Sequence, residues 1–497
     1  MKVSEMALLC IVVLPVVATL ASYLLGGMWR RAATLLAGTI TLLLAIVVAS
    51  RVAGGGSISV GSFISADSLS AIFLVVTAFL YAATALFSIG YLRSSYGSKA
   101  GAYSDRFDRR FFVGLNIFCG AMSIALVMSN IALIWVSIEV TTVVSALLVS
   151  LEDTDGSSEA AWKYILIASM GLGLSLIGVL VLYAAAAPIL GASHALQIGY
   201  LDHAHGLAAE TVELAFVFAV IGFGTKMGLA PMHTWLPDAH SEAPTPISAL
   251  LSGSLLAVSF YAILRFEQVT IINAGSAFPH DVLASFGVLS LLIAALFLLV
   301  QRDMKRMFAY SSVEHMGIIA IGASFGVPIA LAGVMLHVVS HGLAKGTAFF
   351  GAGSFKAKFG TKEIGKISGG ISALPWSGPL LLAAVAALSA LPPFAIFRSE
   401  IMIVYGGMES GGGVGVVILL MLVTLAFGGL SWHTIKMVMS PDATVESPSR
   451  RGEPSIWMVV PMLFGIGGLL LLGIHPPAGF LHLMDSAARE LSGRIAR

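Results

Sequence analysis

The sequence predicts an all-α polytopic membrane protein with about 14 transmembrane helices. Of its 497 residues, 58% are hydrophobic and only 11% are charged, whereas soluble domains usually carry about a quarter charged residues. Apolar runs of about 20 residues recur from end to end, each long enough to cross a hydrocarbon core of about 30 Å. The first run has neither a basic n-region nor a distinct cleavage site, so it is expected to be a membrane helix rather than a signal peptide.

The predicted spans are joined by short loops. In chain order they cover residues 6–26, 32–52, 68–91, 111–129, 131–151, 164–187, 212–241, 243–266, 282–301, 311–329, 330–354, 376–409, 414–436 and 456–475. Prolines interrupt the seventh span, 212–241, and the twelfth, 376–409. The last stretch, HLMDSAARELSGRIAR, predicts a short amphipathic helix at the membrane interface.

Lysine and arginine are distributed unevenly between the loops. Of the 27, 18 lie on the side reached after odd-numbered spans, 6 lie on the opposite side, and 3 lie within spans or at their breaks. Cytoplasmic loops carry the excess of basic residues, so this asymmetry places both termini outside. With its compact loops, the chain is expected to be a multi-pass protein of the cell inner (plasma) membrane.

Four charged residues stand inside apolar sequence: Glu139, Lys226, Lys345 and Glu400. A charge at the bilayer centre costs at least ~2.5–3.5 kcal/mol on insertion scales, so each requires a reason. Structural ion pairs are one explanation, but a pair needs only two members and apolar packing could replace it. A lysine held beside a carboxylate can instead take up and release a proton, as a relay requires.

Two histidines accompany the second lysine. His337, His341 and Lys345 are spaced at i, i+4 and i+8, which places them on one face of a helix. A single intramembrane histidine is usually a packing residue. Because imidazole accepts and releases protons near neutral pH, this stack above a lysine favours a proton path.

The two interrupted spans lie next to these charges. Lys226 is followed by MGLAP, and Glu400 follows LSALPPFAIF. Broken helices at corresponding positions are typical of inverted-repeat transporters with ion sites at mid-membrane. The breaks are five spans apart and predict four regions: 1–110 with helices 1–3, 111–266 as the first repeat with helices 4–8, 282–436 as the second with helices 9–13, and 437–497 with helix 14 and the amphipathic C-terminus.

The two cysteines, Cys10 and Cys119, lie in apolar runs without CxxC or metal-ligand spacing. We therefore expect no cofactor and no metal in this chain.

Several long motifs resemble one family. The segment KMGLAPMHTWLPDAHSEAPTPISALLSG is similar to the signature of the proton-translocating, antiporter-like subunits of respiratory NADH–quinone oxidoreductase, Mrp antiporters and membrane-bound hydrogenases. EAAWKYILIASMGLGLSLIGVLVLY, DMKRMFAYSSVEHMGI, HVVSHGLAKGTAFFGAGS and LSALPPFAIFRSE follow the same family in the same order. SSVEHMGI and RSE most resemble the F subunit of hydrogenase-4 and related formate hydrogenlyase complexes.

The resemblance implies a role for each buried charge. Glu139 and Lys226 would form the interacting pair of a first half-channel, and Lys345 would be the central proton carrier with His337 and His341. Glu400 would be the terminal residue near the exit. The family fold also implies fourteen helices and two inverted five-helix repeats.

The chain departs from some family members in the eighth span. They carry a histidine or lysine there, whereas this span reads SGSLLAVSFYAIL, so a lateral connection would depend on water and on the hydroxyls of Ser252, Ser254 and Ser259. His233 and His240 match the family motif but lie beside the break, where they could instead cap or brace the short helix. Glu314 and His315 are expected at the basic-side mouth of the tenth span, for proton uptake or partner contacts.

These features predict a proton-translocating, non-catalytic subunit of a redox-driven complex, either hydrogenase-4/formate hydrogenlyase-like or NADH–quinone oxidoreductase-like. Its expected partners are other membrane subunits, the lipid bilayer and soluble redox subunits on the basic, cytoplasmic side, but no nucleic acid. Fe–S, Ni–Fe or flavin cofactors are expected in those partners. Two alternatives use the same charges: an Mrp-like cation/proton antiporter subunit, and a proton-driven partner of a non-redox complex for inorganic-carbon uptake.

Overall fold

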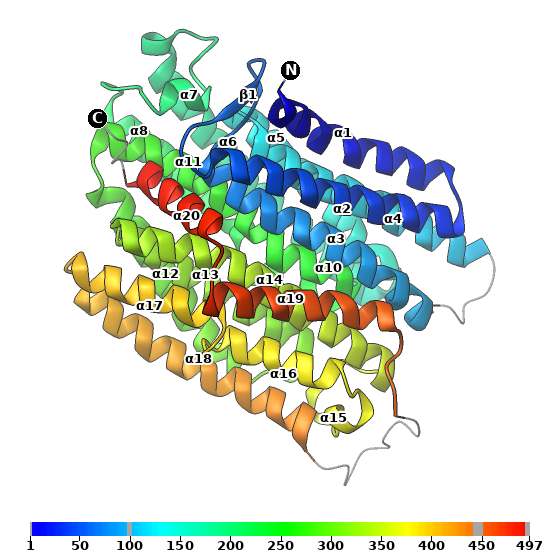
Figure 1. The fold of residues 1–497 in the computed structure, drawn as a ribbon. Coiled ribbons are helices and arrows are strands. Elements are labelled where there is room, and N and C mark those ends of the chain that lie inside the picture. Colours follow the sequence, from blue (N-terminus) through cyan, green and yellow to red (C-terminus); the bar gives the residue numbers. More distant parts are fainter. Residues whose placement is uncertain (1, 97–101, 441–450, 493–497) are drawn as a thin grey trace.

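The computed structural model describes residues 2–96, 102–440 and 451–492. Its helices lie side by side in one bundle (Figure 1). The helices up to the first break are α1 (Val3–Leu24), α2 (Gly27–Val52), α3 (Ser68–Tyr96), α4 (Ala102–Val127), α5 (Ile131–Val149), α6 (Asp155–Leu190), α7 (Ile198–Leu201) and α8 (Ala209–Met227). A short antiparallel hairpin, β1 (Ile58–Val60) and β2 (Ile64–Ala66), joins α2 to α3.

The remaining helices follow the first break. They are α9 (Trp235–Glu242), α10 (Thr245–Leu250), α11 (Leu256–Ala274), α12 (Ala277–Leu298), α13 (Met304–Ser324), α14 (Pro328–Phe359), α15 (Gly370–Ala373), α16 (Ser377–Leu388), α17 (Ala395–Glu409), α18 (Gly413–Met439), α19 (Ile456–Ile474) and α20 (Ala478–Leu491). Single turns of 3₁₀-helix lie at Ser150–Glu152 (η1), Met232–Thr234 (η2) and Ile364–Lys366 (η4), and a π-helical turn, η3 (Leu251–Leu255), joins α10 to α11.

The all-α polytopic fold is confirmed. Twelve helical segments of the described chain are long and apolar enough to cross a membrane. The expected spans 311–329 and 376–409 correspond to α13 and to α16 with α17, which are not among the twelve. Helix α13 carries several charges near its start, and α16 has only 12 residues. The count of fourteen, the inverted repeats and the four regions therefore stay predictions.

Both expected breaks are present. Helix α8 ends at Met227, where Gly228 has a positive φ of 84°, and the chain continues through η2 into α9. A Cβ on Gly228 would lie 2.6 Å from Leu236, so only glycine fits this turn without displacing α9. The indole of Trp235 donates to the carbonyl of Thr225 at 2.8 Å and ties the two pieces together. The second break separates α16 from α17.

The centre of the bundle is formed by α10–α11 and α14, whose most apolar segments are 100% and 94% buried. Both described ends of the chain, the β1–β2 hairpin and α7 lie toward one face (Figure 1), which we call the terminal face. The opposite face, where α3, α5 and α14 end, is called the basic face. Of the basic residues counted above, Lys99, Arg450, Arg494 and Arg497 lie outside the described residues.

The expected C-terminal amphipathic helix is α20. It packs Leu483, Met484, Ala487 and Ala488 inward, and the Ser486 hydroxyl donates to the carbonyl of Ala53 at the end of α2. Residues 493–497 of the expected segment lie outside the described residues.

Candidate functional site

Lys226 occupies the last turn of α8 and is completely buried. Its Nζ donates to Thr142 Oγ1 at 2.7 Å and to the hydroxyl of Tyr164, and lies 4.8 Å from the centre of the Tyr164 ring. The Tyr164 hydroxyl also shares a hydrogen bond of 2.7 Å with Ser145 Oγ. Hydroxyl groups of α5 and α6 therefore hold the ammonium group.

Glu139 lies on α5 and is partly exposed at the surface of the subunit. One carboxylate oxygen accepts from Ser169 Oγ at 3.4 Å, while Oε2 is buried without a hydrogen-bond partner. Glu139 acts on Lys226 electrostatically, but no ion pair joins them in the described part of the chain. The predicted pair is thus coupled through space and not by direct contact.

Lys345 is also completely buried and lies at the middle of α14. Its Nζ donates to the backbone carbonyl of Phe308 on α13 at 3.0 Å. The same carbonyl accepts from Ser312 Oγ at 2.9 Å, and Ser312 shares a hydrogen bond of 2.7 Å with Ser252. A chain of hydrogen bonds, through the Phe308 carbonyl and two serine hydroxyls, therefore extends from Lys345 to the π-helical turn of the eighth span.

The other predicted hydroxyls of this span differ in their contacts. Ser254 donates to Thr77 of α3 at 2.8 Å, whereas Ser259 bonds only to the carbonyl of Leu255 in its own helix. Because π-helical turns are frequent at functional sites, the placement of Ser252 and Ser254 in η3 favours them over Ser259 as members of a lateral path.

His337 and His341 are fully buried on the same helix as Lys345, as the spacing predicted. His315 of α13 lies between them: its Nδ1 is 3.0 Å from His337 Nε2, and its ring centre is 5.3 Å from that of His341. The nitrogens of His341 have no partner among the described residues. The three imidazoles form one cluster next to Lys345.

The expected position of Glu314 and His315 at a basic-side mouth was wrong. Helix α13 begins at Met304, because the Asp303 carboxylate accepts from the backbone amides of Lys305 and Arg306 and caps it. The pair therefore lies ten and eleven residues into the helix, with exposed fractions of 3% and 0%. Glu314 acts on Lys345 electrostatically, as Glu139 does on Lys226.

Glu400 of α17 completes the group. Its Oε1 is buried without a partner, and its carboxylate lies with one nitrogen each of His315 and His337 in a set whose atoms are all within 4.8 Å of one another. These three side chains could bind a metal ion. However, the 3.0 Å separation of the two imidazole nitrogens is that of a hydrogen bond, which favours proton transfer between them. The second nitrogen of His337 contacts Ser399 Oγ at 3.0 Å.

The two histidines beside the first break do not cap a helix. His233 lies within η2, and His240 of α9 stacks on Phe349 with ring centres 5.1 Å apart. Neither ring nitrogen of the buried His240 has a partner among the described residues. Lys305 braces the short helix instead, since its ammonium group donates to the carbonyls of Ser241 at 3.1 Å and Ala243.

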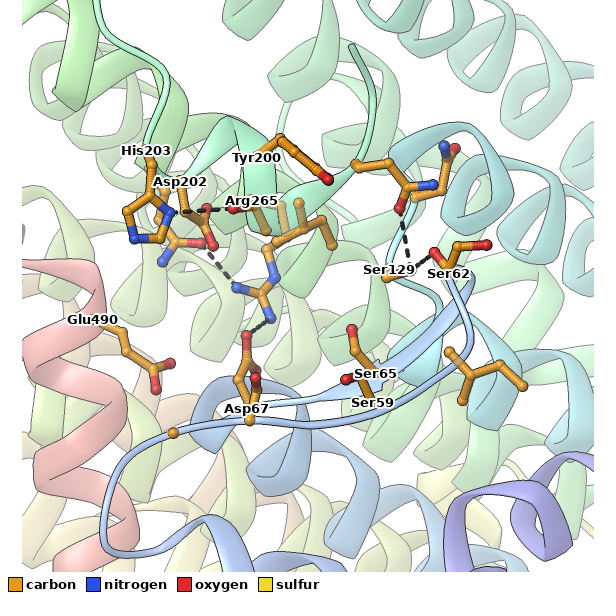
Figure 2. Close-up of a pocket in the computed structure, with 18 of the residues that line it drawn as sticks. Ser59, Ser62, Ser65, Asp67, Ser129, Tyr200, Asp202, His203, Arg265 and Glu490 are labelled. Carbon is orange, nitrogen blue, oxygen red and sulfur yellow. Dashed lines mark hydrogen bonds and ion pairs between the residues drawn. The ribbon is translucent and has the colours of Figure 1, made fainter. Parts of the chain in front are cut away.

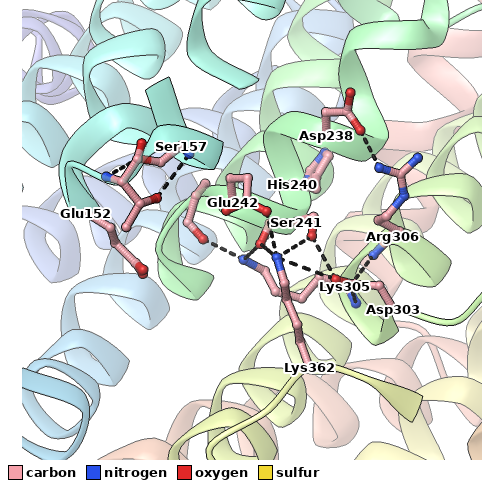
Figure 3. A network of polar contacts seen from close by, with 12 residues as sticks. Glu152, Ser157, Asp238, His240, Ser241, Glu242, Asp303, Lys305, Arg306 and Lys362 are labelled. Atoms are coloured by element: carbon pink, nitrogen blue, oxygen red, sulfur yellow. Dashed lines mark hydrogen bonds and ion pairs between the residues drawn. The ribbon is translucent and has the colours of Figure 1, made fainter. Parts of the chain in front are cut away.

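Charged pairs at the basic face fix α9 between its neighbours (Figure 3). Asp238 pairs with Arg306 of α13 and, at 3.5 Å, with Lys163 of α6. Glu242 pairs with Lys362, which follows α14, at 2.7 Å. These contacts hold the broken span in place while its backbone at the break is not helical.

A polar cavity of about 1120 Å³ opens at the terminal face. Figure 2 shows Arg265 between Asp67 and Asp202, with Glu490 approaching from α20; Arg265 forms an ion pair with Asp67. Burial raises the pKa of Asp202 to about 6, and burial together with the charge of Asp67 raises the pKa of Glu490 to about 7. Sequence reasoning missed this cluster because its members come from four separate segments.

Comparisons with known proteins identify the family and the fold. Residues 128–426 match the family described as NADH:quinone oxidoreductase/Mrp antiporter, transmembrane. The chain is 37% identical over 392 residues to the hydrogenase-4 component F homolog of Methylacidiphilum infernorum, covering 78% of this chain and 82% of that relative.

Two solved structures share the fold. A chain of an archaeal membrane-bound sulfane sulfur reductase superposes with a TM-score of 0.85 at 20% identity, covering 98% of both chains. A chain of the Mrp complex from Dietzia superposes with a TM-score of 0.83 at 18% identity, covering 100% of this chain and 98% of that one.

Proposed function

Because the chain belongs to the NADH:quinone oxidoreductase/Mrp antiporter family, we propose that it is a proton-translocating subunit of a redox-driven membrane complex, similar in type to hydrogenase-4 component F. One observation carries the proposal. Titratable side chains line the middle of the bundle, from the buried Lys226 through the buried Lys345 and histidine cluster to the partly buried Glu400. This chain moves protons, and the redox chemistry takes place in other subunits.

The first half begins at the partly exposed Glu139, which a neighbouring membrane subunit can reach. The charge of Glu139 favours the protonated form of Lys226, so neutralising or displacing that carboxylate makes the lysine proton easier to remove. The hydroxyls of Thr142 and Tyr164 hold the ammonium group but carry no charge to retain its proton.

The second half receives the proton at Lys345. Ser252 and Ser312 provide a hydroxyl bridge on its side of the eighth span, and water would complete the route from Lys226. The proton then passes along the histidine cluster to Glu400. Glu314 has the same role in the second half as Glu139 has in the first, because its charge affects how readily Lys345 releases the proton.

The orientation follows from the distribution of basic residues. The basic face lies in the cytoplasm, the terminal face lies outside, and the host membrane is the cell inner membrane. Soluble redox subunits that carry Fe–S, Ni–Fe or flavin groups dock on the cytoplasmic side, and other membrane subunits contact the surface near Glu139.

The test uses the full chain in its own complex. Lys226→Ala and Lys345→Ala are each expected to lower proton translocation in vesicles at least tenfold, with assembly retained. Lys366→Ala is the matched control, since Lys366 is exposed and pairs only with Glu363 three residues away. The proposal fails if both buried-lysine variants assemble and translocate protons like the parent.

Purification from native membranes tests the redox assignment. Partner subunits with iron, nickel or flavin support it. A sodium-dependent collapse of the pH gradient, with only small membrane subunits recovered, would replace it with Mrp-like cation/proton antiport. A soluble partner that is metal-free or contains only zinc would replace it with a non-redox complex such as inorganic-carbon uptake.

A further inference from the structure

A second cavity lies at the terminal face, next to the polar cavity of Figure 2. It has a volume of about 320 Å³ and is lined by Glu267 of α11, His280 of α12, Gly326 of the turn between α13 and α14, and Leu491 and Ser492 at the end of α20. Helix α20 thus borders both cavities.

Glu267 has no structural reason to be an acid. Its side chain is 4% exposed, and within the described residues its one ionic partner is His280, whose Nε2 lies 3.9 Å from Glu267 Oε1. A buried carboxylate without a hydrogen bond is costly, and an apolar residue of similar size would pack more favourably. The cost is explained if the carboxyl group binds and releases protons.

His280 connects this acid to the outside of the molecule. Its side chain is 21% exposed, and its ring lies against Gly326, where a Cβ would come within 2.2 Å of the imidazole. Gly326 has a positive φ of 63°, so the turn both requires glycine and leaves room for the ring. The other charges nearby are Asp281, which acts on His280, and Arg265, which is paired with Asp67 in the other cavity.

The cavity lies at the end of the helices that carry the histidine cluster. Ala323, near the end of α13, lines it, eight residues after His315. Leu331 of α14 also lines it and is six residues from His337, which corresponds to roughly 9 Å along an α-helix. The histidine cluster therefore lies about two helical turns deeper in the bundle than this cavity, and water molecules would have to bridge the remaining distance to Glu267.

We propose that Glu267 and His280 form the proton-release pair of this subunit, through which protons leave at the terminal face. A proton from the His315–His337–Glu400 group reaches the Glu267 carboxylate through water and forms the carboxylic acid. Glu267 then gives the proton to the imidazole of His280, and the imidazolium ion releases it to bulk water, which restores both groups. This inference rests on the proposed function, because it assigns the exit of the same proton path.

The test compares both cavities in the full chain within its complex, reconstituted in vesicles. Glu267→Gln and His280→Gln are expected to lower proton release at least fivefold with assembly unchanged. Glu267→Asp, which keeps a carboxyl group, is expected to retain more than half of the rate. Glu490→Gln, in the other cavity, is the control and is expected to stay within twofold of the parent.

A sided inhibitor gives a second measurement. Zn²⁺ binds imidazole and carboxylate ligands, so Zn²⁺ added at the terminal face is expected to inhibit the parent protein and to inhibit Glu267→Gln at least tenfold less. If Lys345→Ala stops translocation while Glu267→Gln has the parent rate, this inference is overturned and the proposed function stands. If Glu490→Gln alone stops release, the exit is the other cavity and the inference is again overturned. If Lys345→Ala also translocates normally, the proposed function itself has failed.

Discussion

The attachment of the C-terminal helix is expected to depend on pH through one carboxyl group. Glu490 projects from α20 into the polar cavity, where burial and the neighbouring charge of Asp67 raise its pKa from 4.5 to about 7, against the opposing effect of Arg265. When α20 separates from the bundle, Glu490 meets water and its pKa returns to the ordinary value. The perturbation is Glu490→Gln, which keeps the shape of the side chain and removes its titration.

The direction and size of this pH effect follow from the two pKa values of Glu490, about 7 in the attached state and 4.5 in water. Because the pKa is higher in the attached state, proton uptake stabilises attachment; this stabilisation is complete below about pH 4.5 and is lost as the pH rises through about 7. Between about pH 8.5 and about pH 6, linkage gives about 1.4 kcal/mol, which is a tenfold change in the opening equilibrium. The parent protein should therefore hold α20 about ten times more firmly at the lower pH.

Hydrogen exchange of the α20 backbone amides measures this opening directly, after correction for the intrinsic effect of pH on exchange. Glu490→Gln is expected to abolish the tenfold change. Asp485→Asn, at an exposed position on the same helix, is the matched control and should keep it. The reasoning is refuted if α20 of the parent is equally protected at both pH values, or if the glutamine variant retains the full pH dependence.

Three substitutions test the proton path, each measured as proton translocation in vesicles with assembly checked in parallel. His315→Gln removes the bridge between the two other imidazoles and should lower the rate at least tenfold; a rate within twofold of the parent would exclude His315 from the path. Ser312→Ala breaks the hydroxyl link across the eighth span and should slow translocation severalfold, whereas Ser259→Ala, which loses a bond only within its own helix, should not; equal effects would contradict the lateral route. Tyr164→Phe removes one of the two hydroxyls that hold Lys226. Since a hydrogen bond to a charged group contributes about 1.5–3 kcal/mol, the rate of proton translocation is expected to change tenfold or more. An unchanged rate would show that the hydroxyl has no part in holding the proton.

The sequence predicted the features that depend on a single segment. Twelve of the spans, the two breaks and the shared face of His337, His341 and Lys345 follow from local pattern, because helical periodicity and proline act within a few residues. Ser252 was named because its span lacks the histidine or lysine of some family members, and its part in proton transfer stays a prediction.

Features that join separate helices were missed. Tyr164 and Thr142 look like ordinary residues of amphipathic membrane helices, and only the fold brings their hydroxyls to Lys226. His315 was placed at a helix mouth because the start of α13 was expected seven residues too late; the Asp303 cap, two residues before a basic pair, was the local signal that could have corrected it. Glu267 stands directly after the predicted end of the eighth span at residue 266, and only the fold shows that it is buried.

The two halves of the path use the same arrangement of charges. In each, a carboxylate acts on a buried lysine without touching it: Glu139 on Lys226, and Glu314 on Lys345. A direct ion pair in a membrane interior would hold the proton on the lysine, because separating the two charges there is costly. Here the two lysines donate to uncharged oxygens of Thr142, Tyr164 and the Phe308 backbone. These contacts are weaker than an ion pair, so a charge at a distance can change the equilibrium between the protonated and the neutral lysine. In the proposed path, this separation of acid from lysine is what would allow each lysine to bind and release a proton.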